Sequence, residues 1–395
     1  MLLKDLFERL EELYPEMVRV RRELHMNPEL SFQEKHTPEF IAAYQRELGL
    51  EVQTGVGGNG VVAKIEGGKP GKTIAFRADF DALPINEEND VPYRSKVPGV
   101  MHACGHDAHT AIVLGLSKAL MDVKDQLEGN VVFIHQHAEE LNPGGAKAMI
   151  EDGCLEGVDC IYALHMENYF PIGKIIYSND YILAASDEFE IEVIGRGGHG
   201  AFPHDTVDPI VITSQLVCNL QQIVSRRVDP MHSAVLSVGS FHAGKAHNVI
   251  PDKAVLKGTI RTFDSEVRDL MERELERITS HTCQAAGAKY EFHYERGYPA
   301  TRNHLEETQL LVESAKEVVP VEDIVSIPPN MGGEDFSYFL EKVPGSYFFI
   351  GSANEEKGFV YPYHHPKFDI DEQALLIGAK TYAAVAMRYL MKNPR

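Results

Sequence analysis

"TIAFRADFDALP" (residues 73–84) begins as an apolar run and ends as a polar turn, and this junction decides the fold class. Three similar apolar runs occur further along the chain: "VVFI" (131–134), "CIYAL" (160–164) and "YFFI" (347–350). Runs this short and this apolar are typical of strands that are buried on both faces. Because helical patterns separate them, the sequence predicts an α/β domain with a mostly parallel sheet.

A block with a different pattern interrupts this domain. "EFEIEVIG" (188–195) alternates between polar and apolar residues, and further strand-like and helical segments follow it. This order of elements predicts an inserted α+β domain with an antiparallel sheet and two helices. We therefore expect a catalytic domain formed by residues 1–181 and 292–395, and an inserted domain formed by residues 182–291.

Composition excludes several classes of function. The 395 residues carry a formal net charge of −21 at pH 7, which argues against a nucleic-acid partner because phosphate binding needs a basic surface. We find no apolar stretch long enough to span a membrane. The five cysteines are odd in number and include no C-x-x-C pair, as is typical of reduced thiols in the cytoplasm. We expect a cytoplasmic protein with a small-molecule substrate.

Polar residues directly follow the apolar runs. Asp79 and Asp81 follow the first run, Glu139 and Glu140 the second, and His165 the third. The carboxyl ends of parallel strands meet at one edge of a sheet, where ligands bind. Two adjacent glutamates at a strand end repel each other unless a cation holds at least one of them. The sequence therefore predicts a cluster of ligand atoms at this edge.

Cys104 lies in "HACGHDAH" (102–109), just before a predicted helix, and three interpretations are open for it. It could be a nucleophile with His106 as its base, since a helix N-terminus lowers a thiol pKa. It could pack as a small buried hydrophobe. It could also bind metal together with His106, Glu140, His165 and a histidine near the C-terminus. Five donors exceed the three protein ligands of a usual catalytic zinc site and suit two ions, so we favour the metal ligand.

Several motifs resemble one known family. "RADFDALP", "MHACGHDAH", "AEE", "GGHGAFPH", "NVIP" and "NMGGEDFSYF" are similar to motifs of the aminoacylase and hippurate-hydrolase branch of the co-catalytic metal-dependent carboxypeptidases. This branch includes hydrolases of N-acyl and indole-acetyl amino acids, and the resemblance runs from about residue 18 to the C-terminus. It implies a metal-dependent amidohydrolase with two divalent ions per chain, zinc or manganese, with cobalt also suitable.

The resemblance also implies roles for individual residues. Glu139 matches the general base, and Asp79 matches an aspartate that orients a ligand. His365 and His137 remain as additional candidate ligands, because the chain departs from the family pattern beside each of them. The implied metal ligands are Cys104, His106, Glu140, His165 and His364, the last by its register to Pro366 and Phe368.

In the inserted block, "GRGGHG" (195–200) formally matches a dinucleotide fingerprint. Pro203 interrupts any helix after it and no suitable acidic residue follows, so we reject a dinucleotide site. The resemblance instead implies that His199 stabilises the oxyanion, in its own subunit or in a partner. It marks Asn248 and Arg261 as candidates for binding a substrate carboxylate. It further implies that the block is a lid and a dimerisation domain, giving a homodimer or a larger homo-oligomer.

The predicted reaction is cleavage of the amide bond of an N-acyl amino acid or a small peptide. A metal-activated water attacks the carbonyl, and Glu139 takes its proton and passes it to the amine. Two alternatives stay open: a cysteine hydrolase that uses Cys104 and His106, and a non-catalytic protein that binds a small molecule. For Glu334 and Asp335 the sequence does not distinguish residues that orient the site from residues that cap a helix.

Overall fold

The structure, a computed structural model, describes residues 2–392 and divides into two compact units. The second unit comprises residues 183–300 and 329–334, and the first comprises the rest. The expected border of the inserted block at residue 291 falls inside strand β13 (Lys289–Arg296), which pairs with β8 (Ala185–Ile194) from Lys289 to Arg296. Because one strand cannot be divided between two cores, the second unit extends to residue 300.

The first unit is built on an eight-stranded mixed sheet. The four apolar runs lie in its four central strands, β4, β3, β5 and β16, which are all parallel to their neighbours in this group. This confirms the predicted α/β fold class. The strands in spatial order are β1 (Glu51–Val56), β2 (Gly60–Glu66), β4 (Glu128–Gln136), β3 (Lys69–Asp79), β5 (Cys160–Pro171), β16 (Gly345–Ala353), β6 (Ile175–Tyr177) and β15 (Ile324–Ser326).

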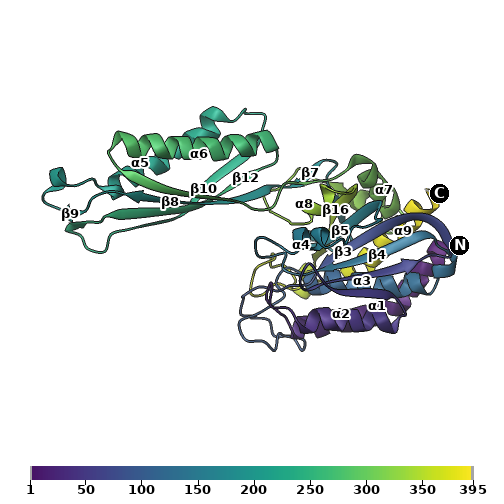
Figure 1. The fold of residues 1–395 in the computed structure, drawn as a ribbon. Coiled ribbons are helices and arrows are strands. Elements are labelled where there is room, and N and C mark those ends of the chain that lie inside the picture. Colours follow the sequence, from purple (N-terminus) through teal and green to yellow (C-terminus); the bar gives the residue numbers. More distant parts are fainter. Residues whose placement is uncertain (1, 393–395) are drawn as a thin grey trace. The chain divides into compact units, whose positions relative to one another are not determined.

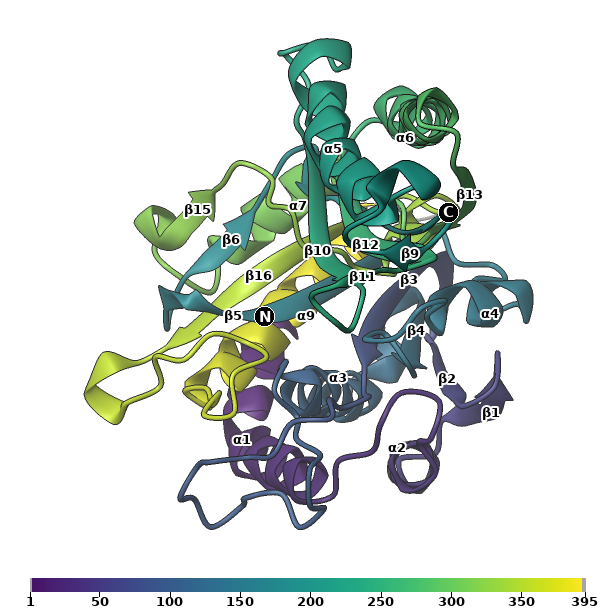
Figure 2. The same cartoon turned by 90° about the vertical axis from the view of Figure 1, so that its left-hand side faces the viewer.

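Helices α3 and α9 pack on the central strands, and α1 packs on both helices from outside (Figures 1 and 2). In α1 the buried apolar residues recur every three or four positions, from Leu6 to Leu24, which gives the helix one apolar face. Gly115 lets α1 approach α3 closely, because a Cβ there would lie 2.4 Å from Met17 Sδ. The helices of this unit are α1 (Leu2–Met26), α2 (His36–Glu47), α3 (His106–Met121), α4 (Ala146–Glu151), α7 (Leu305–Ala315), α8 (Ser337–Leu340) and α9 (Gln373–Lys392).

The second unit has a four-stranded antiparallel sheet, in the order β10, β12, β8, β13, and helices α5 and α6 pack on it (Figure 1). Alternate residues of β8, namely Phe189, Ile191 and Val193, are buried in the core beneath these helices. Asp208 and Asp264 cap the two helices, each accepting two backbone N–H bonds. The remaining elements are β9 (Gly198–His199), α5 (Pro209–Gln222), β10 (Ala234–Ala243), β11 (Val249–Ile250), β12 (Lys253–Thr262) and α6 (Ser265–Ala285).

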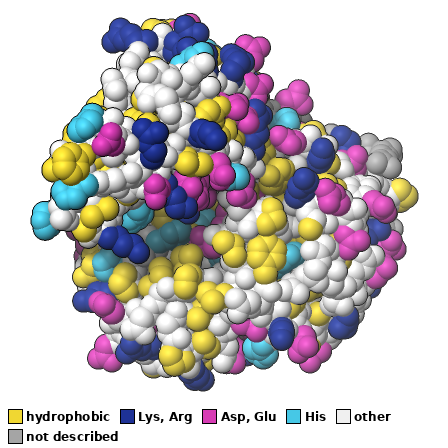
Figure 3. Space-filling model, turned by 60° about the vertical axis from the view of Figure 1, so that its left-hand side comes forward, with side chains coloured by type: hydrophobic (Ala, Val, Ile, Leu, Met, Phe, Trp, Pro, Cys, Tyr) yellow, Lys and Arg dark blue, Asp and Glu magenta, His cyan; other side chains and the backbone are white. Residues whose placement is uncertain are grey.

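The surface carries charges of both signs. On the face drawn in Figure 3, Lys and Arg side chains are scattered among Asp and Glu side chains. In the part of the chain that the structure describes, every helix is too short or too polar to span a bilayer.

Candidate metal centre

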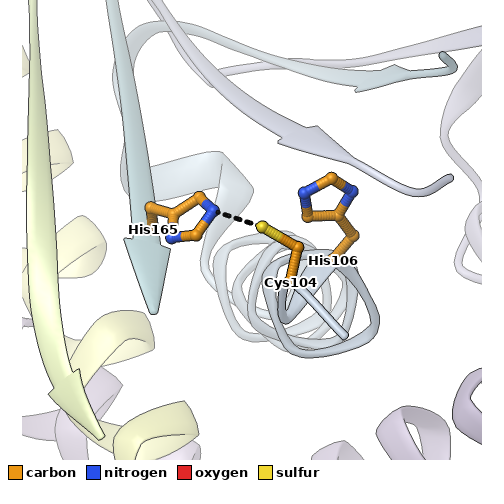
Figure 4. A group of neighbouring side chains, drawn as sticks. All are labelled: Cys104, His106 and His165. Carbon is orange, nitrogen blue, oxygen red and sulfur yellow. Dashed lines mark hydrogen bonds between the residues drawn. The ribbon is translucent and has the colours of Figure 1, made fainter. Parts of the chain in front are cut away.

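Cys104, in the loop just before α3, and His165, within β5, lie side by side although they are far apart in the sequence. The Cys104 Sγ is 3.2 Å from His165 Nε2, and Figure 4 shows it between the rings of His165 and His106. Cys104 precedes Gly105, whose φ of 92° turns the chain into α3 and whose missing Cβ leaves room for Met166. The Nδ1 atom of His165 lies 2.7 Å from the Met166 carbonyl oxygen, to which it donates. The Nε2 lone pair of His165 is therefore directed toward the sulfur.

His106, the first residue of α3, presents a nitrogen that suits a cation. Its Nδ1 lies 3.0 Å from the backbone oxygen of Asp81 and 3.2 Å from Asp81 Oδ1, so it donates there. Its Nε2 is buried without a hydrogen-bond partner, 3.7 Å from Asp79 Oδ2 and 3.9 Å from Glu140 Oε1. Burial lowers the pKa of His106, but Asp79, Asp81 and Glu140 outweigh it and raise the pKa to about 10. Nε2 thus faces a position that stabilises positive charge.

Glu139 and Glu140 follow strand β4 through a left-handed residue, Ala138, which has a φ of 53°. Glu140 Oε1 is buried without a hydrogen-bond partner and lies 3.2 Å from His364 Nε2. Carboxylate oxygens of Glu139 and Glu140 lie within 4.8 Å of each other and of a ring nitrogen of His106. The two neighbouring carboxylates therefore face the same buried position as His106.

Backbone strain accumulates at this centre. His364 has a φ of 64°, and its N–H donates to the carbonyl oxygen of Ala103 over 2.7 Å. Among the described residues, only Phe32, Ala138 and His364 combine a side chain with a positive φ. A left-handed conformation costs a non-glycine residue about 1–2 kcal/mol, and such strain clusters at functional sites. Two of these three residues lie at the candidate centre, one of them a predicted ligand.

All five predicted ligands fall into overlapping groups. Each group has its ligand atoms within 4.8 Å of one another. The thiol, imidazole and carboxylate donors form a set that suits zinc, manganese or cobalt. These groups do not include His365, which stacks on Tyr361, or His137, which contacts the Phe32 ring. Three of these groups together contain all five predicted ligands: Cys104, His106 and His165; Cys104, Glu140 and His364; and His106, Glu139 and Glu140.

Comparison with known proteins identifies the family. The sequence profile of peptidase family M20/M25/M40 matches residues 75–388. The chain belongs to this family. Thermostable carboxypeptidase 2 of Saccharolobus solfataricus is 44% identical over 395 residues, which cover 98% of this chain and 100% of the relative. N-acyl-L-amino acid amidohydrolase of Geobacillus stearothermophilus is 45% identical over 294 residues, which cover 74% of this chain and 80% of the relative.

A solved structure agrees with this assignment. The crystal structure of the Bacillus subtilis YXEP protein, a dinuclear metal-binding peptidase of the M20 family, matches with a TM-score of 0.83 and 34% identity. The match covers 96% of this chain and 99% of that chain. Membership of the M20 family confirms the family resemblance and the predicted enzyme class, a hydrolase of amide bonds.

In this M20 enzyme the two aspartates beside the predicted ligands differ in their contacts. Asp79 accepts from Arg77 Nη1 over 2.7 Å and from His109 Nδ1 over 2.6 Å. His109 Nε2 accepts the Met166 N–H over 3.0 Å, so both of its ring nitrogens are already used. The aspartate that holds the imidazole of His106 is instead Asp81. Asp81 was expected only among the polar residues at this edge of the sheet, without a role of its own, although its place two residues after Asp79 was a signal.

Asp335 joins the site to helix α4. Its buried carboxylate accepts from Arg77 Nη2 over 2.9 Å and from Gln136 Nε2 over 2.8 and 2.7 Å. It also accepts the N–H of Ala146, the first residue of α4, over 3.1 Å. Both interpretations left open for this residue therefore hold, since Asp335 orients Arg77 and satisfies a helix N-terminus.

A buried ionic network lies behind His106. Asp107, the next residue, accepts from His25 Nδ1 over 2.8 Å and from Arg21 Nε over 3.2 Å. Arg21 also donates to Asp369 over 2.6 Å and to Glu372 over 3.1 Å. One arginine of α1 thus binds the start of α3 and the segment that leads into α9.

His25 makes the stability of this network dependent on pH. Burial lowers its pKa, but hydrogen bonds to Asp107 and Glu87 outweigh burial and raise the pKa to about 9. A raised pKa contributes stability fully below the unfolded value of about 6.5, and this contribution is lost as the pH rises through 9. His25→Gln is expected to lower the free energy of unfolding by on the order of 2–3 kcal/mol at pH 6 and by much less at pH 10. Urea unfolding measures this difference, and equal losses at both pH values would contradict it.

The three remaining predicted residues belong to the second unit, outside the groups of possible ligands. His199, on β9, is exposed, and its Nδ1 accepts the Ala201 N–H over 3.0 Å. Asn248 is close to it, because its carbonyl oxygen accepts the Gly200 N–H over 2.8 Å. Arg261, half-buried on β12, pairs with Ser186 near the start of β8. Burial lowers the pKa of Arg261, although Glu188 and Asp187 oppose this.

Proposed function

We propose that this chain hydrolyses the amide bond of N-acyl amino acids or small peptides with two divalent ions, zinc or manganese, with cobalt also suitable. The observation that supports this most is the pair of buried atoms without hydrogen-bond partners, His106 Nε2 and Glu140 Oε1, which face each other among further donors. A ring nitrogen and a carboxylate oxygen that lack hydrogen bonds in a buried site suit a bound cation. The names of the relatives, a carboxypeptidase and an N-acyl-amino-acid amidohydrolase, agree with the substrate class.

The proposed ligands are Cys104, His106, Glu140, His165 and His364. Burial and the negative charges of Glu140, Glu139 and Asp79 raise the pKa of the Cys104 thiol well above its usual value. A free thiolate nucleophile is therefore disfavoured here, whereas a cation would offset these charges. This electrostatic argument favours the ligand role over the cysteine nucleophile. Two ions held by these residues would lower the pKa of the attacking water and polarise the substrate carbonyl.

Glu139 is the proposed general base. Its side chain is 8% exposed and lies beside Glu140, within reach of the same buried position. Glu139 takes one proton from the attacking water and then gives it to the amine nitrogen as the C–N bond breaks. Glu140 stays ionised as a ligand, so the two adjacent carboxylates have different roles because their partners differ.

We propose that His199 stabilises the oxyanion, and that Asn248 and Arg261 bind the substrate carboxylate. Arg261 pairs with Ser186 near the start of β8, whereas His199 follows its end at Ile194. At about 3.3 Å per residue, this part of β8 spans about 26 Å, too far for one amino-acid conjugate to contact both side chains. His199 and Asn248 therefore act in one active site of a homodimer and Arg261 in another. Asp79 orients His109 by a hydrogen bond and faces the His106 ring. We propose that Asp79 thereby supports the metal centre without binding metal itself.

The surface of the second unit supports a homo-oligomer. Several large apolar side chains of this unit are exposed, and a dimerisation domain would bury such side chains against its partner. They are Phe202, Ile210, Val211, Met231, Phe241 and Val249. We also propose a cytoplasmic location, in agreement with the five free cysteines.

Metal analysis and a hydrolysis screen test this function. The purified enzyme is expected to hold two divalent ions per chain and to hydrolyse N-acetyl amino acids, N-benzoyl amino acids or dipeptides. Prolonged treatment with a strong chelator is expected to reduce the rate at least 100-fold, and zinc or manganese should restore it. Full activity after complete metal removal, together with inactivation by an alkylating agent, would instead support the cysteine hydrolase.

A further inference from the structure

The loop between α1 and α2 is fixed against the strand end that carries Asp81. Leu30 forms a parallel bridge with Ala82, and the Ala82 N–H donates to the carbonyl oxygen of Glu29 over 2.8 Å. The Glu29 carboxylate in turn accepts backbone N–H bonds from residues 35, 36 and 37, over 3.0, 3.0 and 2.8 Å. The loop is therefore held from both sides, and its side chains have defined positions next to the site.

Glu34 of this loop binds the turn that carries the proposed base. Its carboxylate is 1% exposed, and one oxygen accepts the Ala138 N–H over 2.9 Å. The other oxygen accepts from Asn59 Nδ2 over 3.0 Å, which fixes the carboxylate in place. Ala138 is the left-handed residue directly before Glu139 and Glu140. The hydrogen bond that Glu34 accepts from Ala138 thus stabilises an unfavourable backbone conformation at the turn that directs both carboxylates.

Ser31 reaches the same residues by a second route. Its hydroxyl donates to Asp81 Oδ2 over 2.7 Å, and the same oxygen accepts the Glu140 N–H over 3.0 Å. The other oxygen, Oδ1, lies 3.2 Å from His106 Nδ1. Ser31 therefore restrains the Asp81 carboxylate. This carboxylate orients His106 by a hydrogen bond to its ring and Glu140 by a hydrogen bond to its backbone.

We propose that Glu34 and Ser31 are positioning residues, which hold the 138–140 turn and Asp81 so that Glu139, Glu140 and His106 meet at the metal centre. This inference rests on the proposed function of that centre. Neither side chain has a described bond to a proposed ligand's side chain, so each acts through a residue between them. Loss of either is expected to affect metal retention and kcat more than KM, because the reacting groups move while the groups that bind substrate stay in place.

The test compares Glu34→Ala, Glu34→Gln and Ser31→Ala in the zinc-loaded enzyme. Zinc retention is measured by dialysis against graded chelator concentrations. The values of kcat and KM are measured with an N-acyl amino acid, and stability is measured as the melting temperature. Glu34→Ala is expected to weaken zinc binding 10- to 100-fold and to lower kcat. Glu34→Gln is expected to recover most of the zinc affinity and most of kcat, because its amide oxygen can accept the Ala138 N–H. Ser31→Ala, which leaves every backbone bond in place, is expected to weaken zinc binding by up to about tenfold.

Asp159→Ala is the matched control. Asp159 also accepts a backbone N–H, that of Thr73 over 2.9 Å, but Thr73 lies in the first half of β3, well before Asp79 at the end of the strand beside the site. It is expected to lower the melting temperature without changing zinc retention or kcat. If Glu34→Ala behaves like this control, or if Glu34→Gln is no better than Glu34→Ala, the positioning role is wrong. If Glu34→Ala does not fold, Ser31→Ala decides, and unchanged zinc retention in that variant overturns the proposal.

Glu139→Ala separates this inference from the proposed function. If Glu139→Ala keeps its turnover, the proposed base is wrong, whatever the zinc retention of the Glu34 variants. If Glu139→Ala is inactive while the Glu34 and Ser31 variants match the wild type, the proposed function stands and the positioning role alone is overturned.

Discussion

Replacing Glu139 with alanine is expected to lower kcat by about 10³-fold or more while both metal ions remain bound. Glu139 lies in one group with His106 and Glu140. Of these three residues, it alone is not a proposed metal ligand. Without it, no described side chain is assigned to accept the proton of the attacking water. The rate measured at saturating substrate, together with metal content by elemental analysis, checks both parts of this expectation.

Glu140→Ala provides the contrast for this result. The neighbouring carboxylate lies 3.2 Å from His364 Nε2 and is a proposed ligand, so its loss is expected to remove metal along with activity. The two variants should therefore differ in metal content: Glu139→Ala is expected to keep its metal, and Glu140→Ala is expected to lose it. Loss of metal in Glu139→Ala would reassign that residue as a ligand.

Cys104→Ala is expected to lose at least one metal ion per chain and nearly all activity. The sulfur belongs to two groups of ligand atoms, one with His106 and His165 and one with Glu140 and His364. Because Cys104 belongs to both groups, it suits a ligand that contacts both ions. Its removal should therefore disturb both metal sites rather than one of them. Metal analysis after gel filtration, with kcat measured on the same sample, tests this.

Cys160→Ala is the matched control for Cys104→Ala. Cys160 is also a buried free cysteine, but it begins β5, whereas His165 further along the same strand reaches the site. Its replacement should cost stability through lost packing and leave the metal content unchanged. Should Cys104→Ala retain both ions, and should the wild type form a covalent adduct with a substrate analogue, the sulfur would be a nucleophile instead.

The centre of the fold could be predicted because it depends on simple chemistry. Four short apolar runs become the four parallel strands at the middle of the sheet, since a strand buried on both faces needs apolar residues throughout. The rule that ligands gather at the carboxyl ends of such strands then brought Glu139, Glu140 and His165 to one edge. These parts of the site follow from periodicity and topology alone.

The remaining parts depend on side-chain geometry, which spacing does not encode. His109 is of a residue type that often binds metal, but both of its ring nitrogens already form hydrogen bonds, one with Asp79 and one with Met166. Asp81 orients His106 because of a rotamer and a tautomer, and neither is visible in a sequence. Glu34 meets Ala138 only after the loop between two helices has packed beside the sheet. The border expected at residue 291 lies inside β13 because the pairing of this whole strand with β8, which assigns it to the second unit, depends on long-range contacts that spacing does not encode.

The bonds of Arg21 to Asp369 and Glu372 have a consequence for synthesis on the ribosome. Arg21 emerges near the beginning of translation, whereas its two carboxylate partners emerge close to the end. The second unit, formed largely by one continuous stretch, can fold while synthesis is still under way. The first unit cannot complete its buried charge network until the last helix has been made. A nascent chain that stalls before residue 369 therefore lacks two of the three carboxylate partners of Arg21, so the first unit cannot bury this arginine with its full set of ion pairs.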